Sequence, residues 1–187
     1  MIENEFKIML DRGQYEKIHA LFAWDAEKEQ VNSYYDSPRL ECSSRHITVR
    51  VRSVSGENYL QMKLPAEQSG NGAVSRIELE QKVSGLPQKL EPETLKSLSG
   101  ADLPELTLLG TLSTFRSVKK FPGAEIDLDR SEYFGVIDYE LEVEYTDEAA
   151  AEAILAEIGQ KVHIDRSAPV TGKIRRFLQE YQKNKGL

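Results

Sequence analysis

The segment Tyr139-Glu140-Leu141-Glu142-Val143-Glu144 (residues 139–144) alternates between acidic side chains and aromatic or aliphatic ones. Because successive side chains of an extended strand point to opposite faces, this segment predicts a β-strand with one apolar and one acidic face. The same alternation marks eight predicted strands in all, near residues 2–10, 30–36, 46–53, 58–64, 74–83, 108–118, 123–129 and 138–145.

Turns and helices are expected between these strands. Ser55-Gly56 and Pro122-Gly123 are typical of tight turns, which favours antiparallel pairing of the strands on either side. Apolar residues at helical spacing predict helices near residues 12–24, 93–98, 147–159 and 170–183. The sequence therefore predicts an α+β fold in one domain over residues 1–187. Eight strands are also enough for a sheet to close into a barrel.

The composition excludes several classes of protein. The chain has 187 residues, of which 40% are apolar and 29% charged, as is typical of a folded, soluble domain. No apolar run is long enough to cross a bilayer and no secretory signal is evident, so we expect a cytoplasmic protein without membrane contact. Cys42 is the sole cysteine, which excludes an internal disulfide. The net charge of −7 argues against general nucleic-acid binding.

The charged face of the predicted sheet separates the two signs by strand. The acidic blocks are Glu3 and Glu5, Asp127 and Asp129, and Glu140, Glu142 and Glu144; the basic residues are Arg50, Arg52, Lys63 and Arg116. One interpretation is a face exposed to water, which is common in antiparallel sheets. The other is a closed barrel, whose interior charges must pair, bind ions or hold a charged ligand. The separation of signs favours the barrel, because like charges at neighbouring positions repel.

Each charged block predicts its own kind of ligand. Carboxylates that cluster without cations nearby in the sequence favour a hard divalent metal, here Mg²⁺ or Mn²⁺. Clustered arginines and lysines favour phosphate, which arginine binds through two parallel hydrogen bonds. A cavity that contains both kinds of block is suited to a polyphosphate bound together with its metal.

Several segments together resemble a known family. Glu3-Asn4-Glu5-Phe6-Lys7 is similar to the Glu-x-Glu-x-Lys signature of the CYTH superfamily, also called the triphosphate tunnel metalloenzymes. In that family the signature lies in the first strand, near the N-terminus. The other matching segments, in chain order, are Tyr34-Tyr35-Asp36-Ser37-Pro38, Val49-Arg50-Val51-Arg52, Leu60-Gln61-Met62-Lys63, Arg76-Ile77-Glu78-Leu79-Glu80, Thr114-Phe115-Arg116, Asp127-Leu128-Asp129, Tyr139-Glu140-Leu141-Glu142 and Gly172-Lys173-Ile174. The matches cover nearly the whole chain, and the chain most resembles the small single-domain bacterial members.

The resemblance implies an eight-stranded antiparallel β-barrel, or tunnel, with helices packed outside. It also implies metal-dependent hydrolysis of a phosphoanhydride bond in inorganic tripolyphosphate or an organic triphosphate. By position, Asp127, Glu140 and Glu142 would hold the main Mg²⁺ or Mn²⁺. Glu3 and Glu5 would bind a second metal or orient the attacking water, and together with Lys7 they are the candidate catalytic residues. The implied phosphate ligands are Lys7, Arg50, Arg52, Lys63, Arg116 and Lys173. Asp129 and Glu144 share the acidic face and are weaker candidates.

Some alternatives remain open at this point. The superfamily also contains adenylate cyclases, so a class IV-type cyclase is a second reading, and a non-catalytic polyphosphate- or nucleotide-binding module is a third. A homodimer through the outer barrel face also stays open. In the last predicted helix, Arg175 and Arg176 are expected on a face exposed to solvent, and Lys173 is the exception if that end of the helix plugs the tunnel.

Overall fold

The computed structural model describes residues 4–65 and 76–186 and divides the chain into two compact units. Unit 1 consists of Met1–Glu29 and Ser113–Leu187, and unit 2 consists of Gln30–Leu112. The strands are β1 (Asn4–Leu10), β2 (Ala26–Asp36), β3 (Thr48–Val54), β4 (Glu57–Pro65), β5 (Arg76–Val83), β6 (Lys89–Leu90), β7 (Leu106–Phe121), β8 (Ala124–Tyr133) and β9 (Val136–Tyr145). The helices are α1 (Arg12–His19), α2 (Glu41–Ser44), α3 (Pro92–Ser99), α4 (Glu148–Lys161) and α5 (Lys173–Lys185).

All eight predicted strands are present, as β1 to β5 and β7 to β9. The short strand β6 was not predicted; it pairs with Leu106 and Thr107 at the start of β7. The pairings within each unit are antiparallel, which confirms the α+β class with an antiparallel sheet. These pairings do not join the strands into a ring, so the closed barrel stays a prediction. Among the described residues, no helix combines the length and the apolar character needed to cross a membrane.

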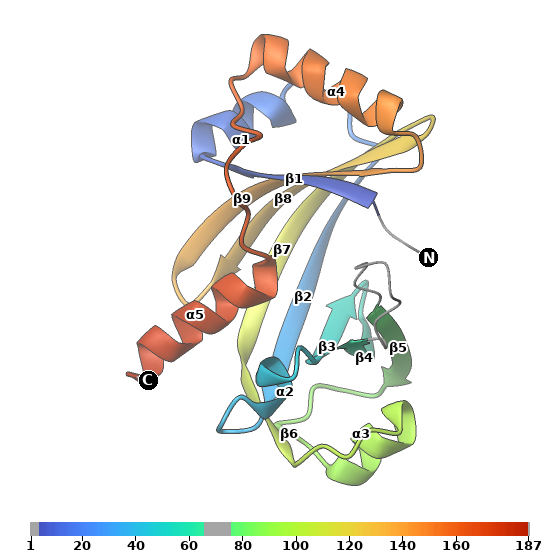
Figure 1. Cartoon of the computed structure of the whole chain (residues 1–187), viewed down its shortest axis with the longest axis vertical. Coiled ribbons are helices and arrows are strands. Elements are labelled where there is room, and N and C mark those ends of the chain that lie inside the picture. The colour runs from blue at the N-terminus through green and yellow to red at the C-terminus, as the bar shows by residue number, and fades with distance from the viewer. Residues whose placement is uncertain (1–3, 66–75, 187) are drawn as a thin grey trace. The chain divides into compact units, whose positions relative to one another are not determined.

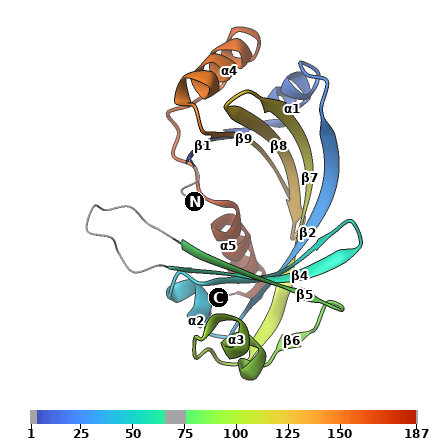
Figure 2. The same ribbon diagram turned by 90° about the vertical axis from the view of Figure 1, so that its right-hand side faces the viewer.

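In unit 1 the strands follow the order β1-β9-β8-β7, and the two faces of this sheet carry different helices. Helices α1 and α4 cover one face, whereas α5 lies against the other (Figures 1 and 2). The buried core forms between the sheet and the first pair of helices, where Ile126, Leu141 and Val143 pack with Ile18 and Leu155. The opposite face, which carries the charged positions of the alternating strands, is therefore the face that α5 meets.

Helix α1 begins as its sequence favours but is shorter than predicted. The carboxylate of Asp11 accepts a hydrogen bond from the Gln14 amide, and the Gln14 side chain accepts one from the Asp11 amide, which forms a capping box. The helix ends at His19 and does not continue to residue 24. Trp24 turns back instead, donates a hydrogen bond from Nε1 to the His19 carbonyl, and packs against the core.

In unit 2, strands β2, β3, β4 and β5 pair in that order, and their apolar face packs on α2, α3 and β6. Tyr35 of the Tyr-Tyr-Asp-Ser-Pro segment lies in this core and donates a 2.6 Å hydrogen bond to the Pro87 carbonyl. The Asp36 carboxylate accepts hydrogen bonds from the amides of Ser37, Cys42 and Ser43. This segment therefore builds the turn that leads into α2, which the sequence pattern did not predict.

Candidate functional site

The charged positions of unit 1 form aligned rows across its sheet. Because side chains at directly paired positions are neighbours on the same face, the strand register fixes which charges meet. The rows are Glu5, Glu144 and Glu125; Lys7, Glu142 and Asp127; and Glu140, Asp129 and Arg116. The register thus brings together charged residues from β1, β7, β8 and β9.

Arg116 is the centre of the resulting ion-pair network. Its Nε and Nη2 atoms each donate a 2.7 Å hydrogen bond to the Asp129 carboxylate, and Nη2 also lies 2.8 Å from Glu142 Oε2. Nη1 donates to Asp127. Burial acts to lower the Arg116 pKa, but the hydrogen bond and charge of Asp129, with those of Asp127 and Glu142, hold it above its ordinary value. Arg116 is therefore a permanent positive charge enclosed by carboxylates.

Two lysines complete the pairing of Glu142. Lys7 Nζ lies 3.0 Å from Glu142 Oε1 and 2.9 Å from Glu5 Oε2, and Lys173 Nζ lies 3.4 Å from Glu142 Oε1. Lys173 also pairs with Asp129. Burial favours the neutral form of Glu142, but the charges of Lys173, Lys7 and Arg116 outweigh it and lower the Glu142 pKa to about 2. Glu142 is therefore ionised at neutral pH.

Asp127 behaves differently although it contacts the same arginine. Burial, followed by the negative charges of Asp129, Glu144 and Glu125, raises its pKa to about 7 against the opposing effect of Arg116. Its Oδ1 atom is buried and has no hydrogen-bond partner among residues 4–65 and 76–186. A buried carboxylate oxygen without a partner is costly, and a metal ion would supply the missing contact.

Arg176 of α5 belongs to the same charged face, which corrects the expectation of a solvent-exposed position. Only 12% of its side chain is exposed, and its guanidinium donates 2.7 Å hydrogen bonds to Asp138 Oδ2 and Glu140 Oε2. Arg175, in contrast, is exposed, as predicted. The Glu140 side chain is 1% exposed, and its second oxygen, Oε1, lacks a partner within the described part of the chain.

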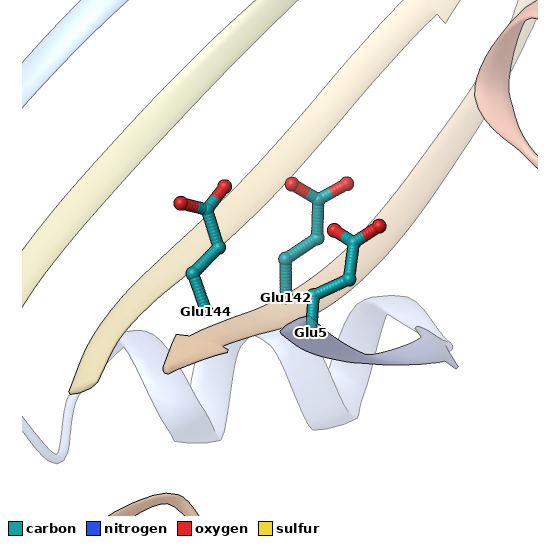
Figure 3. Close-up of side chains that lie close together, drawn as sticks. All are labelled: Glu5, Glu142 and Glu144. Atoms are coloured by element: carbon teal, nitrogen blue, oxygen red, sulfur yellow. The ribbon is translucent and has the colours of Figure 1, made fainter. Parts of the chain in front are cut away.

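Three glutamates of this face approach one another closely. Glu5 on β1 and Glu142 and Glu144 on β9 rise from the same side of the sheet (Figure 3), and one carboxylate oxygen of each lies within 4.8 Å of the others. Like charges this close repel, and Lys7 pairs with two of the three, Glu5 and Glu142. Carboxylate oxygens are the ligands that Mg²⁺ and Mn²⁺ prefer, so this donor set and the unpartnered oxygens of Asp127 and Glu140 fit such an ion.

Unit 2 carries its own row of cations and polar partners. Arg50 Nε donates a 2.8 Å hydrogen bond to Gln61 Oε1, Arg52 Nε a 2.9 Å bond to Asn32 Oδ1, and Lys63 Nζ lies 2.5 Å from Glu78. These three cations project from one face of β3 and β4, opposite the unit 2 core. Glu78, which belongs to one of the segments that resemble the family, is therefore the ion-pair partner of Lys63.

The structure thus gathers most of the predicted unit 1 residues. Those brought into one network are Glu5, Lys7, Arg116, Asp127, Glu140, Glu142 and Lys173. Glu3 lies outside the described residues, and Arg50, Arg52 and Lys63 belong to unit 2. Asp129 and Glu144, the weaker candidates, lie on the same charged face, and Arg176, which was not a candidate, joins the network. Lys173, Arg176 and Phe177 stand at i, i+3 and i+4, and this helical spacing was the signal that could have identified Arg176.

Comparisons with known proteins agree with the sequence resemblance. Residues 1–177 match the model of the CYTH domain. The chain is 27% identical to the Bacillus subtilis (strain 168) protein called "Putative triphosphatase YjbK", over 98% of this chain and 97% of that protein. The crystal structure of a Bacillus halodurans protein described as a "putative adenylate cyclase" matches with a TM-score of 0.69 and 25% identity, over 94% of this chain and 97% of that one. The Hippeastrum protein HpAC1, described as a "putative adenylyl cyclase" with a dominant triphosphatase activity, shares the fold with a TM-score of 0.70 and 18% identity, over 95% and 96%.

Proposed function

Because the chain belongs to the CYTH domain family, we propose that it is an enzyme that hydrolyses a phosphoanhydride bond of a triphosphate with the help of a divalent cation. The substrate is inorganic tripolyphosphate or the triphosphate group of a small organic molecule, and the protein acts in the cytoplasm. Its proposed partner is this small molecule, and neither a nucleic acid nor a membrane.

One observation carries this proposal: the carboxylates and cations of unit 1 form a buried network that leaves carboxylate oxygens unpartnered. Asp127 Oδ1 and Glu140 Oε1 are buried without a hydrogen bond in the described residues. Arg116 and Lys173 stand beside them as cations whose donors match phosphate oxygens. A metal for the carboxylates and a phosphate chain for the cations would satisfy both sets of groups at once.

The proposed metal ligands combine the predicted residues with one addition. Asp127, Glu140 and Glu142 remain the proposed ligands of the main ion, and Glu3 and Glu5 remain proposed ligands of a second one. The closeness of Glu144 to Glu5 and Glu142 supports adding Glu144 to this set. When bound, Mg²⁺ or Mn²⁺ would neutralise charge on the phosphate oxygens and favour ionisation of the attacking water.

The cations of unit 1 would bind and orient the substrate. Lys7, Arg116 and Lys173 would exchange their carboxylate partners for phosphate oxygens, which fixes the phosphorus atom for in-line attack. Where no second metal is bound, a carboxylate oxygen of Glu3 or Glu5 would instead accept the proton of the attacking water. The new P–O bond forms as the anhydride P–O bond breaks, and the leaving phosphate takes the electron pair of the broken bond. Arg50, Arg52 and Lys63 remain predicted phosphate ligands, to be tested by substitution.

An adenylate cyclase is the second candidate, and it is favoured by the description of the Bacillus halodurans protein at 25% identity. A cyclase and a hydrolase would use the same metal and phosphate ligands, so the charged network does not separate them. What separates them is the attacking group, which is water in the hydrolase and the ribose 3′-hydroxyl of the nucleotide in the cyclase.

The deciding experiment incubates the full chain with tripolyphosphate, ATP and thiamine triphosphate in the presence of Mn²⁺ or Mg²⁺. The products orthophosphate, pyrophosphate and cyclic AMP are then separated by ion-exchange chromatography. Metal-dependent release of orthophosphate from at least one substrate is the expected result. Cyclic AMP with pyrophosphate as the main products from ATP would support the cyclase instead. Tight binding without any product would support a non-catalytic binding module.

A further inference from the structure

We propose that Arg176 is a positioning residue that aims the free carboxylate oxygen of Glu140 toward the metal, an inference that rests on the function proposed above. Glu140 is one of the proposed metal ligands, and Arg176 has no assigned role in that scheme. The proposal concerns how Glu140 is held, because a flexible glutamate must be fixed before it can serve as an efficient ligand.

The guanidinium of Arg176 has three separate partners. Nε donates to Asp138 Oδ2 and Nη2 donates to Glu140 Oε2, both at 2.7 Å, while Nη1 donates to the Thr171 carbonyl. Asp138 is in turn held by a 2.5 Å hydrogen bond from the Tyr133 hydroxyl. Because a planar guanidinium offers its donors in a fixed fork, these bonds set the direction of the Glu140 carboxylate.

The result is a carboxylate with one oxygen engaged and one available. Arg176 occupies Oε2 of Glu140, whereas Oε1 is buried and has no hydrogen-bond partner among the described residues. The same arginine also fixes the chain at Thr171, just before Lys173 begins α5. Lys173 Nζ lies 3.7 Å from Glu140 Oε2. Arg176 therefore helps to keep a proposed phosphate ligand, Lys173, next to a proposed metal ligand, Glu140.

If Arg176 is removed, its charge and its geometry predict opposite changes in the affinity for a metal ion, which makes the proposal testable. If Arg176 acted only through its positive charge, removing it would strengthen the binding of a cation nearby. If it acts by holding Glu140 in place, its loss weakens metal binding, typically by 10- to 100-fold for a residue that orients a ligand. Replacement by lysine keeps the positive charge but loses the planar set of guanidinium donors, so it separates the two effects.

The experiment measures the dissociation constant of Mn²⁺ by calorimetric titration of the full chain without any triphosphate. For Arg176→Lys and Arg176→Gln we expect dissociation constants about 10-fold or more above that of the unsubstituted chain. The matched control is Arg175→Gln on the same helix, which changes an exposed arginine and should leave Mn²⁺ binding unchanged. Wild-type affinity in Arg176→Lys, or tighter binding in Arg176→Gln, would overturn the proposal.

A second variant keeps the test decisive if Arg176 is needed for folding. Asp138 and Glu140 are the two carboxylates that bind Arg176. Asp138→Asn weakens the first of these contacts and does not change the Glu140 residue itself. A smaller rise in the Mn²⁺ dissociation constant is expected, and none at all would count against the inference. Phosphate release from tripolyphosphate is measured separately on the unsubstituted chain. Altered Mn²⁺ binding in the variants without phosphate release by the unsubstituted chain would refute the proposed function while leaving the role of Arg176 intact.

Discussion

Arg116 on β7 and Asp129 on β8 face each other directly across the strand pair and are joined by two parallel hydrogen bonds of 2.7 Å. A proposed phosphate ligand is thus bound to a carboxylate in the structure described here. The same holds for Lys7 and Lys173, which both pair with Glu142. The proposed phosphate ligands of unit 1 are therefore all paired with carboxylates, and substrate and metal would have to replace these internal ion pairs.

Arg116 should be important for stability as well as for substrate binding. Arg116→Gln leaves Asp127 and Asp129 without their arginine in a buried site, which should lower the free energy of unfolding by about 3–5 kcal/mol. The control Arg130→Gln breaks only an exposed pair with Glu132 and should cost less than about 1 kcal/mol. Urea denaturation of both variants measures the difference, and equal losses would contradict the buried network.

Glu142 should be required for activity more than for folding. Glu142→Gln removes the negative charge with which Lys7, Arg116 and Lys173 all pair, and it leaves the side-chain volume nearly unchanged. We expect phosphate release from tripolyphosphate to fall at least about 100-fold, because both a proposed metal ligand and the alignment of the cations are lost. Activity and melting temperature are measured on the same preparation. Full activity in a folded variant would remove Glu142 from the proposed site.

Arg52 tests the predicted phosphate ligands of unit 2. Arg52→Ala should weaken tripolyphosphate binding by about 1.5–3 kcal/mol, the contribution of one charge-assisted hydrogen bond. The control is Lys96→Ala on α3, where the lysine forms an exposed pair with Asp102. Calorimetric titration with tripolyphosphate gives both dissociation constants. If both variants bind as tightly as the unsubstituted chain, Arg52 is not a phosphate ligand.

Asp127 should make the stability of the metal-free protein depend on pH. Its pKa is raised from 3.8 to about 7, mainly by burial, so the folded state holds this proton more tightly than the unfolded state. The stabilisation is fully present below the ordinary pKa and is lost as the pH rises through about 7. Urea denaturation between about pH 5 and pH 8 should show this loss, and Asp127→Asn should remove it.

The control for this pH effect is Asp25→Asn. Asp25 is exposed, and the Lys120 amide and the Lys119 side chain hold its pKa below the ordinary value. Its substitution should leave the loss of stability near pH 7 in place. A pH profile of Asp127→Asn that matches the unsubstituted chain would show that Asp127 is ionised throughout this range.

The sequence predicted the parts of this structure that depend on alternation. Glu140, Glu142 and Asp127 were assigned to the charged face because strand periodicity determines which way a side chain points, and the register of β8 and β9 then placed them side by side. Helix α1 was predicted too long because residues 20–24 are apolar and contain no helix breaker, and packing of Trp24 on the core decided its end.

Contacts between residues far apart in the sequence could not be predicted from local sequence patterns. Arg176 meets Glu140 across 36 positions of the sequence, and only the docking of α5 on the sheet brings the two together. In the sequence, Arg175 and Arg176 look alike, and the difference between an exposed and an enclosed arginine appears only when helix and sheet are both in place. The unpartnered oxygens of Asp127 and Glu140 likewise became visible only from their surroundings.

The most direct test of the central claim is phosphate release from tripolyphosphate by the full chain after treatment with EDTA. We predict no release above the uncatalysed rate by the metal-free protein, and recovery of activity when Mn²⁺ or Mg²⁺ is added back in excess of the chelator. Undiminished phosphate release in the presence of excess EDTA, with the metal content checked by elemental analysis, would contradict the claim that the carboxylates of unit 1 serve to hold a catalytic metal.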